Sequence, residues 1–370
     1  MRIGIVTFWD SEDNYGQVLQ CYALQKFLLD KGHDVFLIKY RPIKKWNLRV
    51  LFSRLRMYCS KDISKFIESF TLFFKFRRIA RIKAQDKINH PRNFLSFKQQ
   101  YIRYTDKIYN QYELSANPPK ADAYIAGSDQ IWSGVDSVFF LDFAPKGTLR
   151  IAYAPSFGRN DASVPTLIAK YLSKLDVVTV REQEGISICR QLGRIDASLV
   201  PDPTFLLSAN QYAQISSPIS CEDNFIFLYI LGNDMNFDIS NVYKWGKEQG
   251  LVVRYVASQG KTDSYAKEYP NVDEWIFLMT KAKYVVTNSF HGMVMSIILN
   301  KKFVVIPLSG VFARMNGRIL TTLNRYDLSE RMIFKGELDI LFREIDYSII
   351  NKMLEEQITE ISSNFDLWLH

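Results

Sequence analysis

Residues 283–300, KYVVTNSFHGMVMSIILN, decide the fold because they contain a complete strand, turn and helix. The apolar run at 284–286 is typical of a buried strand, and the run at 293–299 is typical of a helix. The turn between them is built mainly of small and polar residues and carries His291. In a parallel sheet such a turn lies at the carboxyl end of a strand, which is where ligands bind.

The same order of apolar run, polar turn and helix recurs on both sides of this stretch. Expected strands lie within 2–9, 31–40, 121–132, 150–158 and 175–185 in the first half, and within 225–232, 251–258 and 302–307 in the second. Helices are expected near 17–30, up to 249, through 275–282 and from 292. Strands that alternate with helices predict an α/β fold of two Rossmann-like domains whose polar turns face one another across a cleft.

The boundary between the two domains is predicted from the two prolines in LVPDPTFLLSANQYAQI (199–215). We place a hinge near 201–222, so that the first domain covers 1–205 and the second covers 206–340. Residues 341–370 are expected to form a helical tail that packs back across both domains. A basic, aromatic segment at about 43–110 is expected to be a helical insert in the first domain.

The composition indicates a globular protein. Of the 370 residues, 47% are hydrophobic and 23% are charged, which is ordinary for a soluble chain. The four cysteines are scattered without metal-like spacing, so we expect a reduced, cytoplasmic protein with no metal site. The amino terminus turns acidic after nine residues, and no apolar stretch reaches the ~18 residues of a spanning helix. We therefore expect neither a signal peptide nor a membrane crossing.

Positive charge is concentrated in one segment. Residues 41–110 contain 18 Lys and Arg against 4 Asp and Glu, a local net charge of +14, while the whole chain carries +8. Apolar residues at 63, 66, 67, 70, 73 and 74 form a helical stripe among these basic residues. A solvated helical subdomain, a nucleic-acid contact and adsorption to an anionic membrane all fit this pattern. The mixture of aromatic and basic residues favours the membrane, and no helix-turn-helix, zinc-finger or RNP pattern supports nucleic acid.

Two turns carry residues suited to an anion. His291 lies where the N–H groups of a helix start favour negative charge, so it is either an acid, base or phosphate partner, or a satisfied loop histidine. Gly16 allows close approach at the start of the first helix, although Asn14 equally fits a plain N-cap. The turn lacks the GxGxxG spacing of a dinucleotide site, which disfavours NAD and FAD.

Two further turns carry charged and aromatic residues. In GSDQIW (127–132), Asp129 is a candidate base or sugar-hydroxyl partner and Trp132 a candidate sugar platform, or else Asp129 caps a short helix. In VREQEG (180–185), Arg181 is a candidate clamp for phosphate or carboxylate, or half of a surface ion pair. Arg318 in the second half could serve the same anion or simply flank a helix.

Taken together, these turns resemble the polysaccharide pyruvyl transferase family. The stretches that carry the resemblance are, in chain order, NYGQVLQCYALQ, GSDQIW followed by FFLDF, IAYAPSFG, VREQEG, PDPTFLL and VVTNSFHG. They lie between residue 2 and about residue 325, interrupted by the basic insert. The resemblance implies a GT-B-like pair of Rossmann domains. It also implies a transferase that moves the enolpyruvyl-derived group of phosphoenolpyruvate onto a sugar of a cell-surface glycan, usually as a cyclic ketal.

The resemblance also implies roles for individual residues. His291 matches the family's cleft histidine and is expected, with Asp129, to be catalytic. Several members carry an arginine at the position of Ser289, so this chain either supplies that charge from elsewhere or uses the donor differently. No metal and no cofactor beyond phosphoenolpyruvate as donor substrate are implied. Donor binding is expected from Arg181, Arg318, Ser289, Asn14, Gly16 and Gly292, and acceptor binding from Tyr15, Ser128, Gln130, Trp132, Ser156 and Glu182.

Two other functions fit the sequence. One is a nucleotide-sugar-dependent glycosyltransferase of the same architecture, with the arginines on a diphosphate, and the other is a non-catalytic, membrane-associated glycan-assembly protein. Capsule and exopolysaccharide units built on a lipid carrier would explain the basic insert, with the protein peripheral on the inner face of the membrane. The expected partners are phosphoenolpyruvate, a free or lipid-linked glycan acceptor, and an anionic membrane surface through residues 43–110, without nucleic acid.

Overall fold

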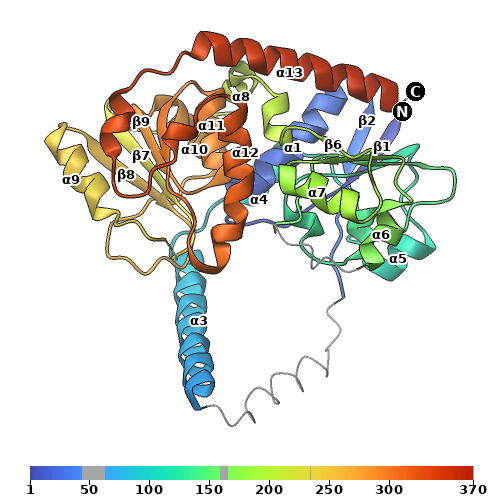
Figure 1. Ribbon diagram of the computed structural model, residues 1–370, viewed down its shortest axis with the longest axis horizontal. Helices are drawn as coiled ribbons and strands as arrows, with labels where there is room; N and C mark the ends of the chain where they lie inside the picture. Colours follow the sequence, from blue (N-terminus) through green and yellow to red (C-terminus); the bar gives the residue numbers. More distant parts are fainter. Residues whose placement is uncertain (44–62, 159–165, 234, 370) are drawn as a thin grey trace.

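Two parallel sheets organise the structure, a computed structural model that describes residues 1–43, 63–158, 166–233 and 235–369 (Figure 1). The first sheet has the strand order β2-β1-β3-β4-β5-β6, and the second has the order β10-β9-β7-β8. Every strand pair in both sheets is parallel. The strands are β1 (Arg2–Val6), β2 (Asp34–Leu37), β3 (Ala123–Ala126), β4 (Leu149–Ala152), β5 (Val177–Val180), β6 (Ser198–Leu199), β7 (Phe225–Ile230), β8 (Val252–Ala257), β9 (Tyr284–Thr287) and β10 (Lys302–Val305).

Helices follow the strands and cover the sheets. In the first half they are α1 (Tyr15–Asp30), α3 (Ile63–Asn89), α4 (Phe94–Tyr101), α5 (Gln111–Ala116), α6 (Leu167–Leu172) and α7 (Gln183–Gln191). In the second half they are α8 (Ala209–Gln214), α9 (Ser240–Glu248), α10 (Val272–Lys281), α11 (Phe290–Ile298), α12 (Gly317–Arg325) and α13 (Tyr347–Trp368). The central strands β3, β7 and β9 are buried along their whole length, which explains their unbroken apolar sequences. The two-domain α/β fold expected from the sequence is confirmed.

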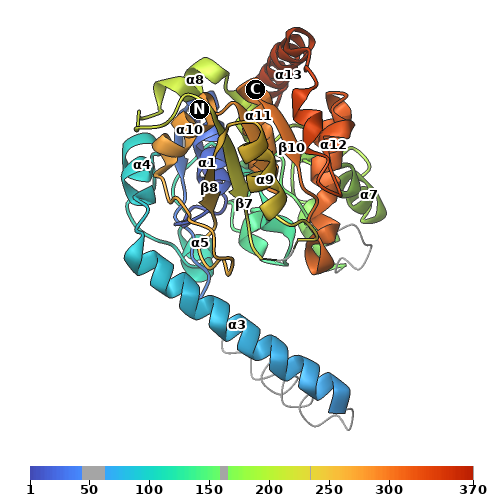
Figure 2. The same cartoon turned by 90° about the vertical axis from the view of Figure 1, so that its left-hand side faces the viewer.

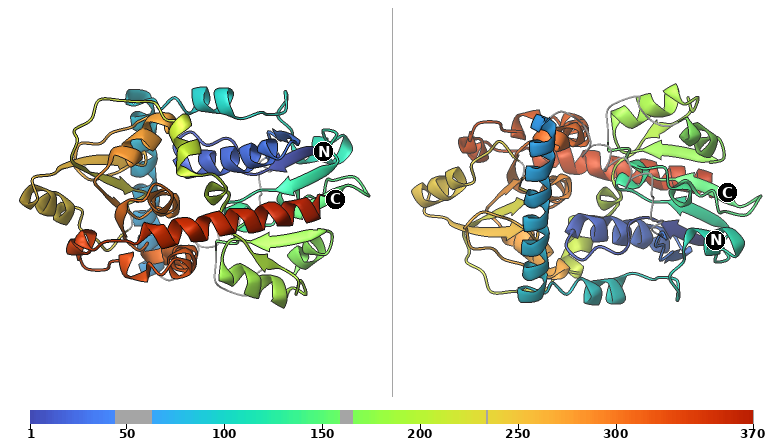
Figure 3. Two further views of the ribbon diagram at one scale, coloured as in Figure 1. Left: turned by 90° about the horizontal axis from the view of Figure 1, so that it is seen from above. Right: turned by 90° about the horizontal axis from the view of Figure 1, so that it is seen from below.

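The two domains share a continuous apolar core. Tyr15 on α1 of the first domain stacks on Trp275 of α10 at a ring distance of 5.1 Å, and both side chains are fully buried. The carboxyl-terminal helix α13 lies across both domains (Figures 1 and 3). At its start Tyr347 Oη donates to Lys301 O at 2.5 Å, and at its end Phe365 packs against Phe27 of α1. The tail thus fastens one domain to the other.

Helix α3 projects from the body as a long rod (Figure 2). Its chain position is in the first domain, but Figure 3 shows it crossing beneath the second domain. Gly260, in the loop after β8, donates to Asp86 Oδ2 at 2.8 Å. On the first-domain side, Lys83 Nζ lies 2.6 Å from Asp13 Oδ2. The insert therefore bridges the two domains. Residues 44–62 of the insert, and the side chains of its expected apolar stripe up to residue 73, lie outside the described residues.

Candidate functional site

The candidate site lies where both sheets reverse their strand order. In the first sheet β1 stands between β2 and β3, and in the second β7 stands between β8 and β9. Ligands of open parallel sheets bind in the crevice at such switch points. A cavity of about 250 Å³ occupies this space, with walls from the loops after β1, β3, β7 and β9. Its lining residues are Phe8, Asn14, Gln17, Asp129, Gln130, Leu231, Gly232, Asn288, Ser289, Phe290, His291, Leu308, Phe312, Met315 and Arg318.

The turn before α11 is held by its own polar side chains. Asn288 accepts a hydrogen bond from Leu231 N at 2.7 Å and donates one to Leu231 O at 2.9 Å, which ties the end of β9 to the end of β7. Ser289 caps α11 by accepting from Gly292 N at 3.2 Å. A Cβ at Gly292 would lie 2.6 Å from Thr287 Oγ1, so a larger residue does not fit. These contacts set the start of α11, which favours an anion, against the cavity.

His291 is held between the two domains. A Cβ on Gly16 would lie 2.1 Å from His291 Nδ1, so the imidazole packs directly on the backbone of α1. Its Nε2 lies 3.6 Å from Asp202 Oδ2 and has no hydrogen-bond partner within the described residues. The side chain is buried, yet it contributes to the cavity wall. An imidazole that borders both a carboxylate and a cavity has the arrangement of a proton-transfer group.

Replacing Gly16 with alanine is expected to displace the His291 ring, because the new methyl group would overlap it. Overpacking of this kind costs about 1–3 kcal/mol of unfolding free energy, which denaturant unfolding would measure. The control is Gly134→Ala, because a Cβ at Gly134 meets nothing within 4 Å. Equal denaturation midpoints for Gly16→Ala and the control would contradict the close contact between α1 and His291.

A buried group of charges lies behind the cavity wall. Arg181 Nη1 lies 2.6 Å from Asp202 Oδ2, and its Nη2 lies 3.6 Å from Asp129 Oδ1. Its Nε lies 3.8 Å from Glu182 Oε2. Asp202 Oδ2 also accepts a hydrogen bond from Ser128 Oγ at 3.1 Å. One arginine thus holds three carboxylates that come from the ends of three different strands.

These contacts determine the protonation states of the carboxyl groups. Burial alone would raise the pKa of Asp202, but His291 and then Arg181 hold that pKa well below its usual range. The pKa of Asp129 is also lowered against burial, chiefly by Arg181. Burial raises the pKa of Glu182, although Arg181 opposes this effect. Asp129 and Asp202 are therefore ionised at neutral pH, and Arg181 compensates them.

Arg318 is the cation in the cavity wall. It lies on the first turn of α12, with Cζ 5.3 Å from the centre of the Phe290 ring, and Arg181 Cζ lies 4.7 Å from the same ring. Its Nε is enclosed without a hydrogen-bond partner in the described part of the chain. Burial, and next to it the charge of Arg181, lower the pKa of Arg318 to about 10, so the group stays charged at neutral pH. A desolvated cation beside a cavity favours an anionic ligand.

Several residues singled out in the sequence come together at the cavity. They are Asn14, Asp129, Gln130, Ser289, His291 and Arg318. Gly16 and Gly292 lie beside them, but their close contacts are with His291 and Thr287 rather than with open space. The individual catalytic and binding roles of these residues stay predictions.

Other expected site residues lie behind the cavity lining. Arg181 is 3% exposed, is paired with carboxylates and does not line the cavity, and its expected role in donor binding stays a prediction. Glu182 accepts a hydrogen bond from Phe157 N at 3.1 Å. Ser128 is fully buried and donates to Ala154 O, and Ser156 Oγ accepts from Gly158 N. Ser128, Ser156 and Glu182 are thus buried behind the cavity lining in this structure, and their expected role in acceptor binding stays a prediction.

Two aromatic residues expected to bind the acceptor belong to the core. Trp132 is 1% exposed, donates from Nε1 to Phe139 O at 2.9 Å and stacks on Phe140, so it offers no face to a sugar. Tyr15 is fully buried between the domains, and its hydroxyl donates to Pro270 O at 2.6 Å. Their role in this structure is packing.

The sequence reasoning overlooked Asp202, which joins Arg181 to His291. Its signal was available, because PDP at 201–203 follows β6 at the position where the other strands carry their polar turns. Gln17, on the first turn of α1, and the hydrophobic Phe8 and Phe290 also line the cavity without having been singled out. A phenylalanine beside polar residues carries no distinctive signal.

Two properties concern the described residues as a whole. They contain no cluster of His, Cys, Asp and Glu arranged to hold a metal ion. No helix among them combines the length and the apolar character needed to span a bilayer.

Comparison with known proteins places the chain in a family. A UDP-GlcNAc 2-epimerase from Methanocaldococcus jannaschii is 9% identical, with a TM-score of 0.48, 92% of this chain and 91% of that chain being covered. The glycosyltransferase SnogD from Streptomyces nogalater is 13% identical, with a TM-score of 0.41 and coverage of 100% and 99%. A search of curated proteins returned no match. The family profile described as polysaccharide pyruvyl transferase matches residues 14–310, which include every strand except β1 and most of the cavity lining. The chain belongs to the polysaccharide pyruvyl transferase family.

Proposed function

We propose that the protein transfers the enolpyruvyl-derived group of phosphoenolpyruvate to a pair of sugar hydroxyls and forms a pyruvate ketal. The methylene carbon of the donor gains one proton and becomes a methyl group. Two bonds form from sugar oxygens to the central carbon, and the bond from that carbon to the phosphate oxygen breaks. One hydroxyl proton balances the new methyl group, and the other leaves with phosphate.

The enclosed cation beside His291 carries this proposal. Arg318 faces the cavity with an unpartnered Nε, and the start of α11, where Phe290 packs on Arg318, borders the same cavity. Both favour an anion with phosphate and carboxylate groups. The cavity volume of about 250 Å³ is below the roughly 300–1,000 Å³ of sites for drug-sized ligands. A small donor such as phosphoenolpyruvate therefore suits this cavity better than a nucleotide sugar.

His291 and Asp129 are assigned the proton chemistry. His291 borders the cavity with Asp202 behind it, which suits delivery of a proton to the methylene carbon. Asp129 is ionised and lines the cavity, so it can accept a hydrogen bond from the attacking hydroxyl and orient it. Its lowered pKa makes it a weak base, so orientation is the role that the electrostatics support.

The acceptor is assigned to the wider opening that adjoins this cavity. A second cavity of about 560 Å³ shares Phe8 and Gln17 with the first and is bordered by Trp9 and by Lys83 of α3. A glycan could enter here and present its hydroxyls to the donor. The excess positive charge of residues 41–110 supports a lipid-linked acceptor and an anionic membrane surface close to α3.

Replacing Arg318 with glutamine is expected to weaken phosphoenolpyruvate binding by roughly 10- to 100-fold, the value of one charged hydrogen-bonded contact. Isothermal titration of the purified protein with phosphoenolpyruvate measures this change. Arg314→Gln is the matched control, because it removes the same charge from an exposed side chain outside the cavity lining. The control is expected to bind within about twofold of the wild type.

Three outcomes of this titration, extended to other ligands, would contradict the proposal. Binding of a UDP- or GDP-sugar without phosphoenolpyruvate binding would make the protein a glycosyltransferase. Binding of neither would favour a non-catalytic protein of glycan assembly. Equal losses in Arg314→Gln and Arg318→Gln would show that the anion does not use the cavity beside His291.

A further inference from the structure

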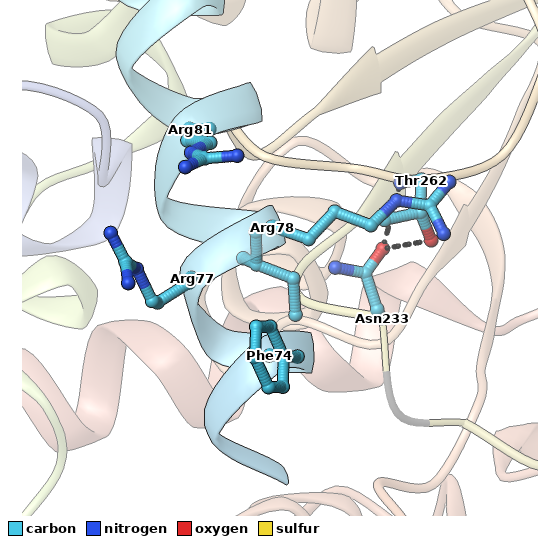
Figure 4. Close-up of a pocket in the computed structure, with 7 residues that line it drawn as sticks. Phe74, Arg77, Arg78, Arg81, Asn233 and Thr262 are labelled. Carbon is cyan, nitrogen blue, oxygen red and sulfur yellow. Dashed lines mark hydrogen bonds between the residues drawn. The ribbon is translucent and has the colours of Figure 1, made fainter. Parts of the chain in front are cut away.

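A third cavity, of about 630 Å³, lies where α3 crosses the loops of the second sheet (Figure 4). Its lining residues are Phe74, Arg77, Arg78, Ile79, Arg81, Asn233 and Thr262. Three of these are arginines from little more than one turn of α3. Asn233 and Thr262 come from the loops after β7 and β8, so the cavity joins the insert to the second domain.

The arginines give this cavity a net positive charge. On α3, Lys83 pairs with Asp13 and Lys87 pairs with Glu12, whereas Arg78 and Arg81 form no ion pair with a described residue. Figure 4 shows Arg78 reaching across the cavity toward Asn233 and Thr262. Guanidinium groups without a carboxylate partner are suited to bidentate contact with phosphate oxygens.

The opposite wall is fixed in place by hydrogen bonds. Asn233 Oδ1 accepts from Thr262 N at 3.0 Å and from Thr262 Oγ1 at 3.2 Å, and Asn233 Nδ2 donates to Gly260 O at 3.0 Å. Gly260 N in turn donates to Asp86 of α3 at 2.8 Å. Gly260 has φ +83°, and a Cβ there would lie 3.2 Å from Lys83 Cβ, so glycine allows the loop to press against the helix. The loops that carry Asn233 and Thr262 are therefore held in a fixed position against α3.

The arginine cavity is next to the other two cavities. Gly232 lines the cavity beside His291, while the adjacent Asn233 lines the arginine cavity. Gln259 lines the cavity with Trp9, while Thr262 of the same loop lines the arginine cavity. Along α3, Arg81 is two residues before Lys83, a rise of about 3 Å. A single extended ligand could therefore reach from the arginines, past Trp9, to His291.

We propose that Arg78 and Arg81, with Asn233 and Thr262, bind the diphosphate or phosphate group of the acceptor substrate. The sugar attached to this group then extends through the cavity bordered by Trp9 and Lys83 and presents its hydroxyls at the cavity beside His291. This inference rests on the proposed pyruvyl transfer. It gives the basic insert a defined ligand chemistry and makes the acceptor a phosphorylated or diphosphate-linked sugar.

Titration with inorganic pyrophosphate tests the site. The Arg318→Gln background weakens the anion site beside His291, and in it pyrophosphate is expected to bind through α3. Adding Arg78→Gln and Arg81→Gln is expected to lower pyrophosphate affinity by about 10- to 100-fold. The control pair is Lys244→Gln with Lys247→Gln, exposed lysines of α9 that lose the same charge. Equal affinities in the α3 variant and the control would overturn the proposal.

Phosphoenolpyruvate titration separates this inference from the proposed function. With Arg318 intact, Arg78→Gln/Arg81→Gln is expected to bind phosphoenolpyruvate as tightly as the wild type. If the wild type binds pyrophosphate through α3 but not phosphoenolpyruvate, the arginine site stands and pyruvyl transfer fails. If phosphoenolpyruvate binds while the α3 variant keeps its pyrophosphate affinity, pyruvyl transfer stands and the arginine site fails.

Vesicles identify the source of the phosphate group. Flotation is compared for phosphatidylcholine vesicles, for the same vesicles with phosphatidylglycerol, and for the same vesicles with a polyprenyl diphosphate. Selective binding to the diphosphate lipid, lost in Arg78→Gln/Arg81→Gln and displaced by pyrophosphate, supports a lipid-linked acceptor. Binding to no vesicle, with pyrophosphate affinity retained, supports a soluble phosphorylated acceptor. Equal binding to both anionic vesicles would mean that α3 senses surface charge and would overturn a dedicated diphosphate site.

Discussion

Replacing Arg181 with methionine is expected to destabilise the fold by about 3–5 kcal/mol, because it leaves buried carboxylates without their cation. Arg181 is 3% exposed and contacts Asp202, Asp129 and Glu182. Methionine has a similar length and no charge, so the change removes the ion pairs with little change in packed volume. The difference in unfolding free energy is measured by denaturant unfolding of both proteins, with one common m-value fitted to the two curves.

The exposed pair of Arg2 and Asp34 provides the control. These side chains are 56% and 63% exposed, and Arg2→Met is expected to cost less than about 1 kcal/mol. The double variant Arg181→Met/Asp202→Asn should be less destabilised than the sum of the two single variants, because each single change leaves the other charge uncompensated. Additive losses in this cycle would contradict a direct coupling of the two residues.

The pairing of Arg181 with Asp202 also predicts how the stability difference between the wild type and Arg181→Met changes with pH. The folded-state pKa of Asp202 is held below its unfolded value of about 3.9. Its contribution is therefore fully present above that unfolded value and is lost as the pH falls through the lower folded-state value. The stability gap between the wild type and Arg181→Met should be constant near neutrality and should narrow in acid.

The strand-end turns were predictable because they depend on local patterns. Short apolar runs followed by small and polar residues marked the strands correctly, and each polar turn lay at a carboxyl end. The order of the strands was not predictable in this way. That order places the loops after β1 and β3 opposite those after β7 and β9, and it thereby selects which turns share a cavity.

Side-chain direction was the part that the sequence did not reveal. Trp132 and Tyr15 follow strands just as Asp129 does, yet their rings turn into the core because large apolar surfaces are stabilised by burial. Arg181 ends a strand like a ligand clamp, but Asp202, 21 residues away in sequence, takes up its charge. Such pairings depend on contacts between separate strands, which no local pattern specifies.

The position of helix α3 was likewise not predictable from the sequence. Its charge and helical periodicity predicted α3, and its chain position suggested packing on the first domain. The contact of Gly260 with Asp86 instead places the helix against the second domain as well. A glycine and an aspartate 174 residues apart gave no signal before the fold was known.

Replacing His291 with glutamine is expected to lower kcat/KM for pyruvyl transfer by roughly 10²- to 10⁴-fold, the usual value of a positioned acid or base. The assay is phosphate release from phosphoenolpyruvate with glycan acceptors extracted from membranes, and mass spectrometry checks for the added ketal. Glutamine keeps a polar side chain of similar reach, so the contact with Gly16 is relieved only in part. The fold should survive, because the buried Arg181 pairs do not depend on the imidazole.

The split between kinetic constants identifies the role of His291. A group that transfers a proton in the transition state lowers kcat when it is lost, whereas loss of Arg318 should act mainly on the KM for phosphoenolpyruvate. His90→Gln is the matched control, because His90 stacks on Tyr269 outside the cavity lining. Activity of His291→Gln within about tenfold of His90→Gln would remove the imidazole from the chemistry.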